Sequence, residues 1–436
     1  MLALARVSRI FFSNLGGGRF HRKFHTIWVR FRLSNDRIPK RNLHADDVTF
    51  FYSWQALCWH KGAKPELRES PTRVPSHLPL LLSQGAKSQA MLLLPTACSG
   101  LTVPQTSLGT LKVAPVGLGT LNFPLDKTED PSTAEALRAA LGKGVNLVDT
   151  AEAYGFGKSE ELTRWALREA QANGEVAVAT KFAPVPWRQN AEDVVAACKA
   201  SRERLGVEQI DLYQIHFPDI IQPLKPFGLE RRKEEEYWDG LARCVELGLV
   251  ANVGVSNYGP TLVWRAHEAL ARRGVPLVSN QINLSLMYRK AQQPTLKVCE
   301  ELGVRVLGYF PLANGLLAGK YDAENMPPFP KSLTMKKYVA GGVTQGGVTY
   351  PPGGATPLIR ELRAIGGERG VSAAQVAINW VVAQGAIPIP GARNAAMAAE
   401  NAAAMEWALS ADEALRLEAA ADAVGFEFSS GGFQLE

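Results

Sequence analysis

Short apolar runs alternate with helical patterns along most of the chain, and this alternation restricts the fold more than any other feature. Each run has the length and the β-branched content of a strand, and each interval has the periodicity of an amphipathic helix. The expected strands are 113–119, 145–149, 176–181, 210–216, 250–255, 277–281, 304–309 and 386–389. The expected helices are 132–143, 158–171, 191–204, 234–247, 260–273, 293–302 and 356–384 with a break near Gly370. Eight strands, each followed by a helix, predict an α/β fold with a single (β/α)8 TIM barrel.

Weaker signals describe the two flanks of this barrel. A small hairpin is expected around Gly109, and two extra helices follow the last strand, one from Asn394 and one from the capping-box pattern Ser410-Ala-Asp-Glu413. A similar pattern, Ser132-Thr-Ala-Glu135, predicts the start of the first helix. The stretch from Pro311 to Thr356 is rich in Gly and Pro and predicts one long loop, which usually covers a site or is disordered.

The positive charge of the chain is concentrated at its N-terminus. Residues 1–100 hold 15 Lys/Arg and 5 Asp/Glu, so the remaining residues hold 48 − 15 = 33 against 42 − 5 = 37. The barrel region is therefore mildly acidic, which argues against a nucleic-acid partner. No apolar run approaches the roughly 18 residues that a membrane span requires. The five cysteines form no CxxC or Cys/His cluster, so no metal site is indicated.

We expect two parts, with residues 1–100 as a transit-peptide-like or disordered segment and residues 101–436 as the barrel. The first 45 residues are Arg-rich and almost free of acids, as organellar targeting segments are. Residues 46–100 are typical of a linker or of disorder. A start at Met91, with a shorter targeting segment, is an alternative. The predicted location is a chloroplast or other plastid, with the cytoplasm or the mitochondrion as alternatives.

Three successive strands end in residues that can carry chemistry. Asp149 ends the strand that begins at Val145 and Tyr154 follows it, Lys181 ends the next strand, and His216 ends the third. The carboxyl ends of parallel strands meet around one mouth of a barrel, so all four side chains should converge there.

Together, these four residues are suited to the reduction of a carbonyl group. A nearby ammonium lowers the pKa of a phenol, so Lys181 would make Tyr154 a proton donor, and Asp149 would keep Lys181 charged and aimed. His216 would orient the carbonyl and stabilise charge developing on its oxygen. None of the four is a hydride source, so a nicotinamide cofactor is implied. Taken singly, each residue has an ordinary structural explanation, and only their joint occurrence favours catalysis.

Residues 106–424 resemble the aldo-keto reductase superfamily, and in closer detail its plant plastid-type branch, which includes pyridoxal reductase-like enzymes. The matching stretches include Asn146-Leu-Val-Asp-Thr-Ala-Glu-Ala-Tyr-Gly, Gly254-Val-Ser-Asn and Ile389-Pro-Gly-Ala-Arg. The resemblance implies the barrel, a small-molecule carbonyl substrate and NADPH (NADP+) bound in an extended form across the mouth. It implies no membrane and no Rossmann motif, and it leaves the oligomeric state open.

The resemblance also implies which residues hold the cofactor. Ser256, Asn257 and Gln281 would bind the nicotinamide carboxamide, and Tyr309 would stack on the ring. Arg393 would bind the 2′-phosphate. Met397 stands where the family often has Gln or Arg, so the preference for NADPH over NADH would rest mainly on Arg393. The remaining implied contacts are Gly119 and Thr120 by close backbone approach, Pro311, Leu312 and Leu317 along the pyrophosphate, and Glu400 and Asn401 at the adenine.

Substrate choice is expected to come from Phe123, Trp187, Phe217 and the 311–356 loop. Two other functions remain open at this point. One is a redox-sensing regulatory subunit that binds NADPH and turns over little. The other is a barrel isomerase or hydrolase, in which the Ser256-Asn257 and Arg393 stretches would have no role.

Overall fold

The eight expected strands form one parallel sheet. The structure is a computed structural model and describes residues 105–127, 129–172, 176–219, 233–328, 331–345 and 348–428. Neighbouring strands pair in the order β12-β9-β8-β7-β6-β5-β4-β3, so consecutive strands of the chain lie side by side. The strands are β3 (Leu118–Gly119), β4 (Leu147–Asp149), β5 (Ala177–Phe182), β6 (Ile210–Ile215), β7 (Val250–Ser256), β8 (Leu277–Asn283), β9 (Arg305–Tyr309) and β12 (Ile387–Pro388).

Hydrogen bonds between the first and the last strand close this sheet. The Gly117 amide donates to the Pro388 carbonyl at 2.9 Å, and the Gly119 amide donates to the Pro390 carbonyl at 3.0 Å. Gly119 also forms a parallel bridge with Gly391. Closure leaves no sheet edge and confirms the predicted (β/α)8 barrel. The carboxyl ends of all eight strands consequently lie on one rim.

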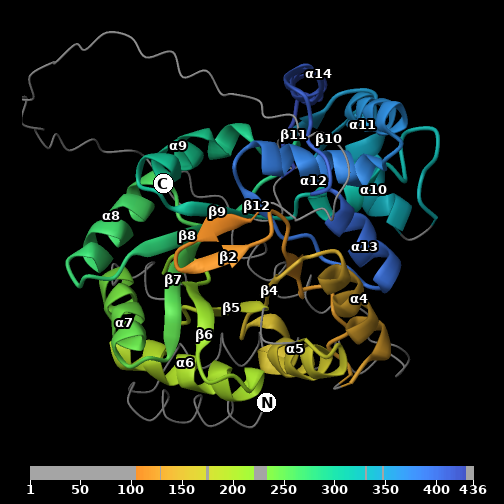
Figure 1. Cartoon of the computed structure of the whole chain (residues 1–436). Coiled ribbons are helices and arrows are strands. Elements are labelled where there is room, and N and C mark those ends of the chain that lie inside the picture. The colour runs from red at the N-terminus through yellow and green to blue at the C-terminus, as the bar shows by residue number, and fades with distance from the viewer. Residues whose placement is uncertain are drawn as a thin grey trace, which may run out of the picture. The chain divides into compact units, whose positions relative to one another are not determined.

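Helices surround the strands, as Figure 1 shows. They begin and end close to the predicted positions, and the predicted break near Gly370 separates α11 from α12, with Gly370 in a left-handed conformation (φ 68°). The helices are α4 (Pro131–Gly142), α5 (Lys158–Glu169), α6 (Ala191–Leu205), α7 (Glu234–Glu246), α8 (Pro260–Ala271), α9 (Gln293–Glu301), α11 (Thr356–Arg369), α12 (Ala373–Ala383), α13 (Ala395–Ala403) and α14 (Ala411–Asp422).

One of the two predicted capping boxes is confirmed. Ser410 and Glu413 bond reciprocally at the start of α14. At α4 the prediction was wrong, because Asp130 is the N-cap and accepts from the Thr133 amide at 3.0 Å. Ser132 donates its hydroxyl to the same carboxylate. Pro131 fixes the first helical position, so the helix starts two residues earlier than the Ser/Glu spacing suggests.

The predicted hairpin is present as β1 (Thr106–Leu108) and β2 (Leu111–Val113), and it covers the amino end of the barrel. The Thr110 amide at its turn donates to Asn252, near the start of β7, at 3.0 Å. Leu108 and Val113 pack with residues from inside the barrel, including Leu212. Since the hairpin fills this end, the opposite rim is the one available for a ligand.

The stretch from Pro311 to Thr356 is not the plain loop that the sequence suggested. Its described residues include η4 (Ala313–Ala318), α10 (Lys331–Val339) and a hairpin of β10 (Val343–Gln345) and β11 (Val348–Tyr350). The ring of Tyr338 lies 5.5 Å from that of Tyr350 and 4.8 Å from that of Phe428. These aromatic contacts with the C-terminal segment supply the burial that orders the insertion, and no local sequence pattern reveals them.

Residues 1–100, including the expected targeting segment and the alternative start, lie outside the described residues. Within the described ranges, no helix is both long and apolar enough to span a membrane.

The closed seam gives a first prediction. A Cβ added at Gly119 would lie 2.9 Å from the Ile389 carbonyl oxygen, which is backbone and cannot rotate away. We expect Gly119→Ala to destabilise the protein by about 1–3 kcal/mol, measured as the fall in thermal unfolding temperature. Gly142→Ala is the control, because its added Cβ meets nothing within 4 Å. Equal melting temperatures for the two variants would contradict this account of the seam.

Candidate active site

A buried ion pair lies at the centre of the carboxyl rim. Lys181 Nζ is 2.5 Å from Asp149 Oδ1 and also donates to the Thr150 carbonyl at 2.8 Å. The Lys181 side chain is fully buried and that of Asp149 is 3% exposed. Gln281 Nε2 donates to the other carboxylate oxygen at 2.8 Å. Two charges removed from water are tolerated only with such full pairing, so these contacts fix the position of the ammonium group.

Burial also sets the proton affinity of Lys181. It lowers the pKa of the ammonium group below its ordinary value, against the attraction of Asp149 and, more weakly, of Glu160. An ammonium group with a lowered pKa releases its proton more readily than one in water.

Tyr154 and His216 lie next to the ion pair. Tyr154 begins η1 (Tyr154–Gly157), and Lys181 Nζ is 5.2 Å from the centre of its ring. The His216 ring meets the Tyr154 ring edge to face at 5.6 Å. The structure thus brings together all four residues that the strand ends predicted, Asp149 included.

His216 is held in its neutral form. Burial, and secondly the charge of Lys181, lower the pKa of the imidazole well below its ordinary value. Its Nδ1 atom is buried without a hydrogen-bond partner among the described residues. A neutral imidazole beside a tyrosine can donate to a substrate oxygen without adding a second positive charge.

A chain of hydrogen bonds joins the predicted nicotinamide residues to this group. Tyr309 donates its hydroxyl to Asn257 Oδ1 at 2.7 Å, and Asn257 Nδ2 donates to the His216 carbonyl at 2.9 Å. Ser256 donates its hydroxyl to the Gln281 carbonyl at 2.8 Å. Asn257 has a φ of 63°, a left-handed conformation that asparagine tolerates better than most residues. The four residues therefore form one connected surface beside the tetrad.

The first strand contributes Gly119 and Thr120. The Thr120 amide donates to the Asp149 carbonyl at 2.9 Å, and its hydroxyl lies 2.8 Å from that of Ser159. Thr150 donates its hydroxyl to Ser159 at 3.0 Å. Gly119 is required by the barrel seam itself, independently of any cofactor.

The residues after β9 differ in what they can offer a ligand. Pro311 is buried and Leu312 is half-buried. Leu317 is wholly buried in the core, and its amide already donates to the Leu312 carbonyl at 3.1 Å. Leu317 therefore shapes this turn from below, and its side chain is not presented at the rim.

Arg393 directly precedes the N-cap of α13, and Glu400 and Asn401 lie in the second half of this helix. Arg393 is exposed, and within the described part of the chain it has no ion-pair partner. Glu400 is half-buried. Asn401 Nδ2 donates to the Gly391 carbonyl at 3.2 Å, and Gly391 is bridged to Gly119, so this group is continuous with the first strand.

The aromatic residues expected at the mouth divide into two kinds. Trp187 is 75% exposed, and the ring of Phe217 lies 5.5 Å from that of His216. Phe123 is only 5% exposed and packs in the core with Leu118. The chain after β3 turns this ring inward, and the expectation that Phe123 helps to select the substrate stays a prediction.

Behind the tetrad lie charged residues that no sequence pattern predicted. Glu152 pairs with Arg188, and Glu160 pairs with Arg204. Each pair joins residues more than 30 positions apart, so no local spacing marks it. The one local signal was the position of Glu152 between Asp149 and Tyr154.

Comparison with protein families agrees with this geometry. The model of the aldo/keto reductase family matches residues 115–422, which is most of the chain and includes the barrel. The chain belongs to the aldo/keto reductase family.

Its relatives within the family include a plant enzyme. The chloroplastic pyridoxal reductase of Arabidopsis thaliana is 38% identical over 333 residues, which cover 73% of this chain and 86% of that protein. Among solved structures, the glycerol dehydrogenase of Gluconobacter oxydans is 25% identical with a TM-score of 0.60, covering 74% of this chain and 97% of that one. The Bombyx mori aldo-keto reductase in complex with NADP is 26% identical with a TM-score of 0.54, covering 74% and 94%.

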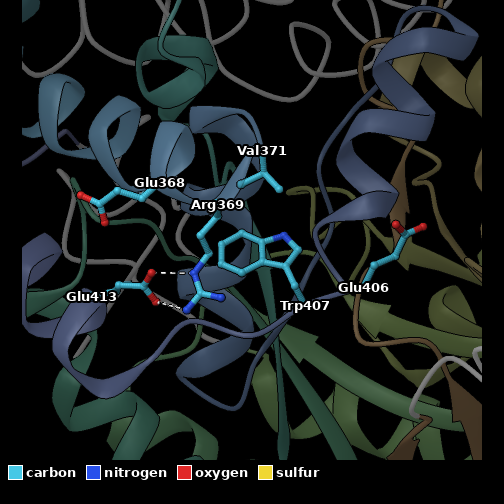
Figure 2. A pocket seen from close by; sticks show the side chains of 6 residues that line it. All are labelled: Glu368, Arg369, Val371, Glu406, Trp407 and Glu413. Carbon is cyan, nitrogen blue, oxygen red and sulfur yellow. Dashed lines mark hydrogen bonds and ion pairs between the residues drawn. The ribbon is translucent and has the colours of Figure 1, made fainter. Parts of the chain in front are cut away.

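This aldo/keto reductase also has a cavity of about 550 Å³ away from the tetrad, shown in Figure 2. Arg369 donates to both carboxylate oxygens of Glu413 and lies 5.3 Å from the Trp407 ring centre. This bonding by Arg369 holds the pKa of Glu413 at about 2. The charged groups of Arg369 and Glu413 are therefore committed to each other, and this ion pair joins α11 to α14. No metal-binding cluster of His, Cys, Asp or Glu is found among the described residues.

The state of His216 can be tested by its titration. Since its folded pKa is lowered, the unfolded chain binds a proton below about pH 6.5 before the folded protein does. Stability should therefore fall as the pH drops through this range, and His216→Gln should reduce the fall. Side-chain NMR of the folded protein should show the His216 imidazole still neutral at about pH 6.5, where a free imidazole is half protonated. A midpoint near 6.5 would contradict the assignment.

Proposed function

We propose that this protein is an NADPH-dependent reductase that converts aldehydes or ketones to alcohols, with Tyr154 as the proton donor. The observation that carries the proposal is the buried Lys181–Asp149 pair, whose ammonium lies 5.2 Å from the ring centre of Tyr154. An ammonium held at this distance favours the phenolate and so makes the phenol a better acid.

The chain's own residues divide the work on the carbonyl. The neutral imidazole of His216 donates to the carbonyl oxygen and orients it. Tyr154 passes its proton to the same oxygen as negative charge develops there, and Lys181 stabilises the phenolate that remains. In the reverse direction Tyr154 acts as the base. When bound, the reduced nicotinamide supplies the hydride to the carbonyl carbon.

The residues beside the tetrad fit a nicotinamide. Ser256, Asn257 and Gln281 offer hydroxyl and amide groups for a carboxamide, and the half-buried Tyr309 offers a ring face for stacking. Asn257 bonds to His216 and Gln281 bonds to Asp149, so a nicotinamide ring held there would face the carbonyl carbon of the substrate.

The outer groups would hold the rest of the cofactor. Arg393 would clamp the 2′-phosphate by charge-assisted hydrogen bonds, with Glu400 and Asn401 at the adenine. The backbone from Gly119 to Thr120 and around Pro311 and Leu312 would follow the pyrophosphate, with Leu317 supporting that turn.

The substrate and the location remain specific proposals. Trp187 and Phe217 give the mouth aromatic surfaces that suit small aldehydes or a flat ring such as pyridoxal. The similarity to a chloroplastic pyridoxal reductase supports pyridoxal as the first substrate to test, and with the basic N-terminus it supports a plastid location.

The central experiment measures NADPH oxidation with pyridoxal and with 4-nitrobenzaldehyde. Tyr154→Phe should lower kcat by about 10²–10⁴-fold, because the proton donor is lost while the ring remains. Binding of NADPH, followed by quenching of Trp fluorescence, should be unchanged. Tyr338→Phe, in the distant aromatic cluster, is the matched control and should keep full activity.

Two results would count against the proposal. Full activity of Tyr154→Phe would remove the assigned proton donor. Negligible turnover by both wild type and Tyr154→Phe, with intact NADPH binding, would instead favour a redox-sensing regulatory subunit.

A separate prediction concerns cofactor choice. Arg393→Ala should raise KM for NADPH by about 10–100-fold, which corresponds to one lost hydrogen bond to a charged group. KM for NADH should stay the same, because NADH has no 2′-phosphate. Equal effects on both cofactors would show that Arg393 has another role.

A further inference from the structure

The carboxylate of Glu152, two residues before Tyr154, joins the tyrosine's loop to the strand of the lysine. It accepts from the Ala183 amide at 2.7 Å, just after the end of β5. It also accepts from both terminal nitrogens of Arg188, from NH2 at 3.1 Å. The Glu152 side chain is 9% exposed, so this forked ion pair is largely shielded from water.

Arg188 is itself fixed from several sides. It donates to the Ala183 carbonyl at 3.0 Å, and its guanidinium lies 4.8 Å from the ring centre of Phe182. The Tyr237 hydroxyl donates to the Arg188 carbonyl at 3.0 Å. A rigid partner of this kind can define where Glu152 sits, which a mobile surface arginine could not do.

A second carboxylate holds the other side of the lysine. Glu160 is wholly buried and accepts from the Thr180 hydroxyl and from Arg204 Nε, both at 2.6 Å. Thr180 directly precedes Lys181, and Ala183 lies two residues after it. Carboxylates on both sides of Tyr154 in the chain therefore bond to residues on both sides of Lys181, to the hydroxyl of Thr180 and to the backbone amide of Ala183.

The loop of Tyr154 needs such support because its backbone is strained. Gly155, Phe156 and Gly157 all have left-handed conformations, with φ of 60°, 56° and 92°. Glycine adopts this conformation without strain, so the strain falls on Phe156. Phe156 is not a glycine and its side chain is 92% exposed, so its own packing does not hold it. Conformations of this kind persist where the surrounding structure imposes them.

We propose that Glu152 and Arg188 are positioning residues that hold the Tyr154 ring against Lys181. The proposal rests on the proposed reductase function and adds to it two residues outside the tetrad and the cofactor surface. The distance that they hold matters chemically. If the phenol moves outward by about 2 Å, from about 4 to about 6 Å from the ammonium, the lost attraction raises its pKa by about one unit.

The test compares Glu152→Ala with the wild type in two measurements. The first is the titration of the Tyr154 phenol, followed by ultraviolet absorbance as the difference between each protein and the same protein carrying Tyr154→Phe. The second is the pH profile of kcat for carbonyl reduction. Lys181, Asp149 and His216, the titratable groups around the Tyr154 ring, are kept throughout.

We expect the phenol midpoint to rise by about one unit in Glu152→Ala and kcat near neutral pH to fall about tenfold. KM for NADPH should not change, since Arg393 and the nicotinamide surface are untouched. Arg188→Lys keeps the positive charge but loses the two parallel hydrogen bonds to Glu152. It should therefore raise the phenol midpoint and lower kcat by smaller amounts than Glu152→Ala. If Glu152→Ala does not fold, Arg188→Lys provides the test in its place.

The matched control is Arg369→Gln, which breaks another forked ion pair far from the tetrad, with Glu413. It should lower the melting temperature without moving the phenol midpoint or kcat. If folded Glu152→Ala and Arg188→Lys lose only stability, as the control does, the proposal is overturned. The phenol titration needs no substrate, so a wild type without turnover would defeat the proposed function while leaving this measurement decisive for the positioning role.

Discussion

The buried ion pair between Lys181 and Asp149 is the interaction on which the rest of the site depends. Moving two charges out of water is costly, and removing one partner would leave the other uncompensated. The structure offsets this cost with the Thr150 carbonyl and the Gln281 amide, which come from different strands. A barrel with any other strand register would separate these groups. The fold and the chemistry are therefore fixed by the same set of contacts.

The polar network around this pair explains how the barrel joins two tasks. Gln281 bonds to Asp149, and Asn257 bonds to the His216 carbonyl, so the surface proposed to hold a nicotinamide is bonded directly to the groups proposed to transfer the proton. Behind the pair, Glu152 and Glu160 connect the tyrosine loop to β5. In the proposed reaction, the proton donor and the hydride donor would thus be held by one rigid framework, and holding reacting groups in place lowers a reaction barrier.

Much of this could be predicted from the sequence, and the exceptions have physical causes. The strands and their polar ends were recognisable because a buried parallel strand is a short apolar run whose last residues reach the rim. The start of α4 was misplaced because Asp130 competes with Ser132 for the cap. The helix α10 and the hairpin of β10 and β11 depend on distant packing partners, which no window of sequence contains.

The sequence by itself determined the alternation of strand and helix, the four polar residues at the strand ends and the family motifs, because these depend on local periodicity and residue type. Only the tertiary structure decided that glycine seams close the barrel, that Gln281 bonds to Asp149 and that Arg188 pairs with Glu152. Those contacts join residues distant in the chain. Their energies depend on burial and distance, and both exist only once the chain has folded.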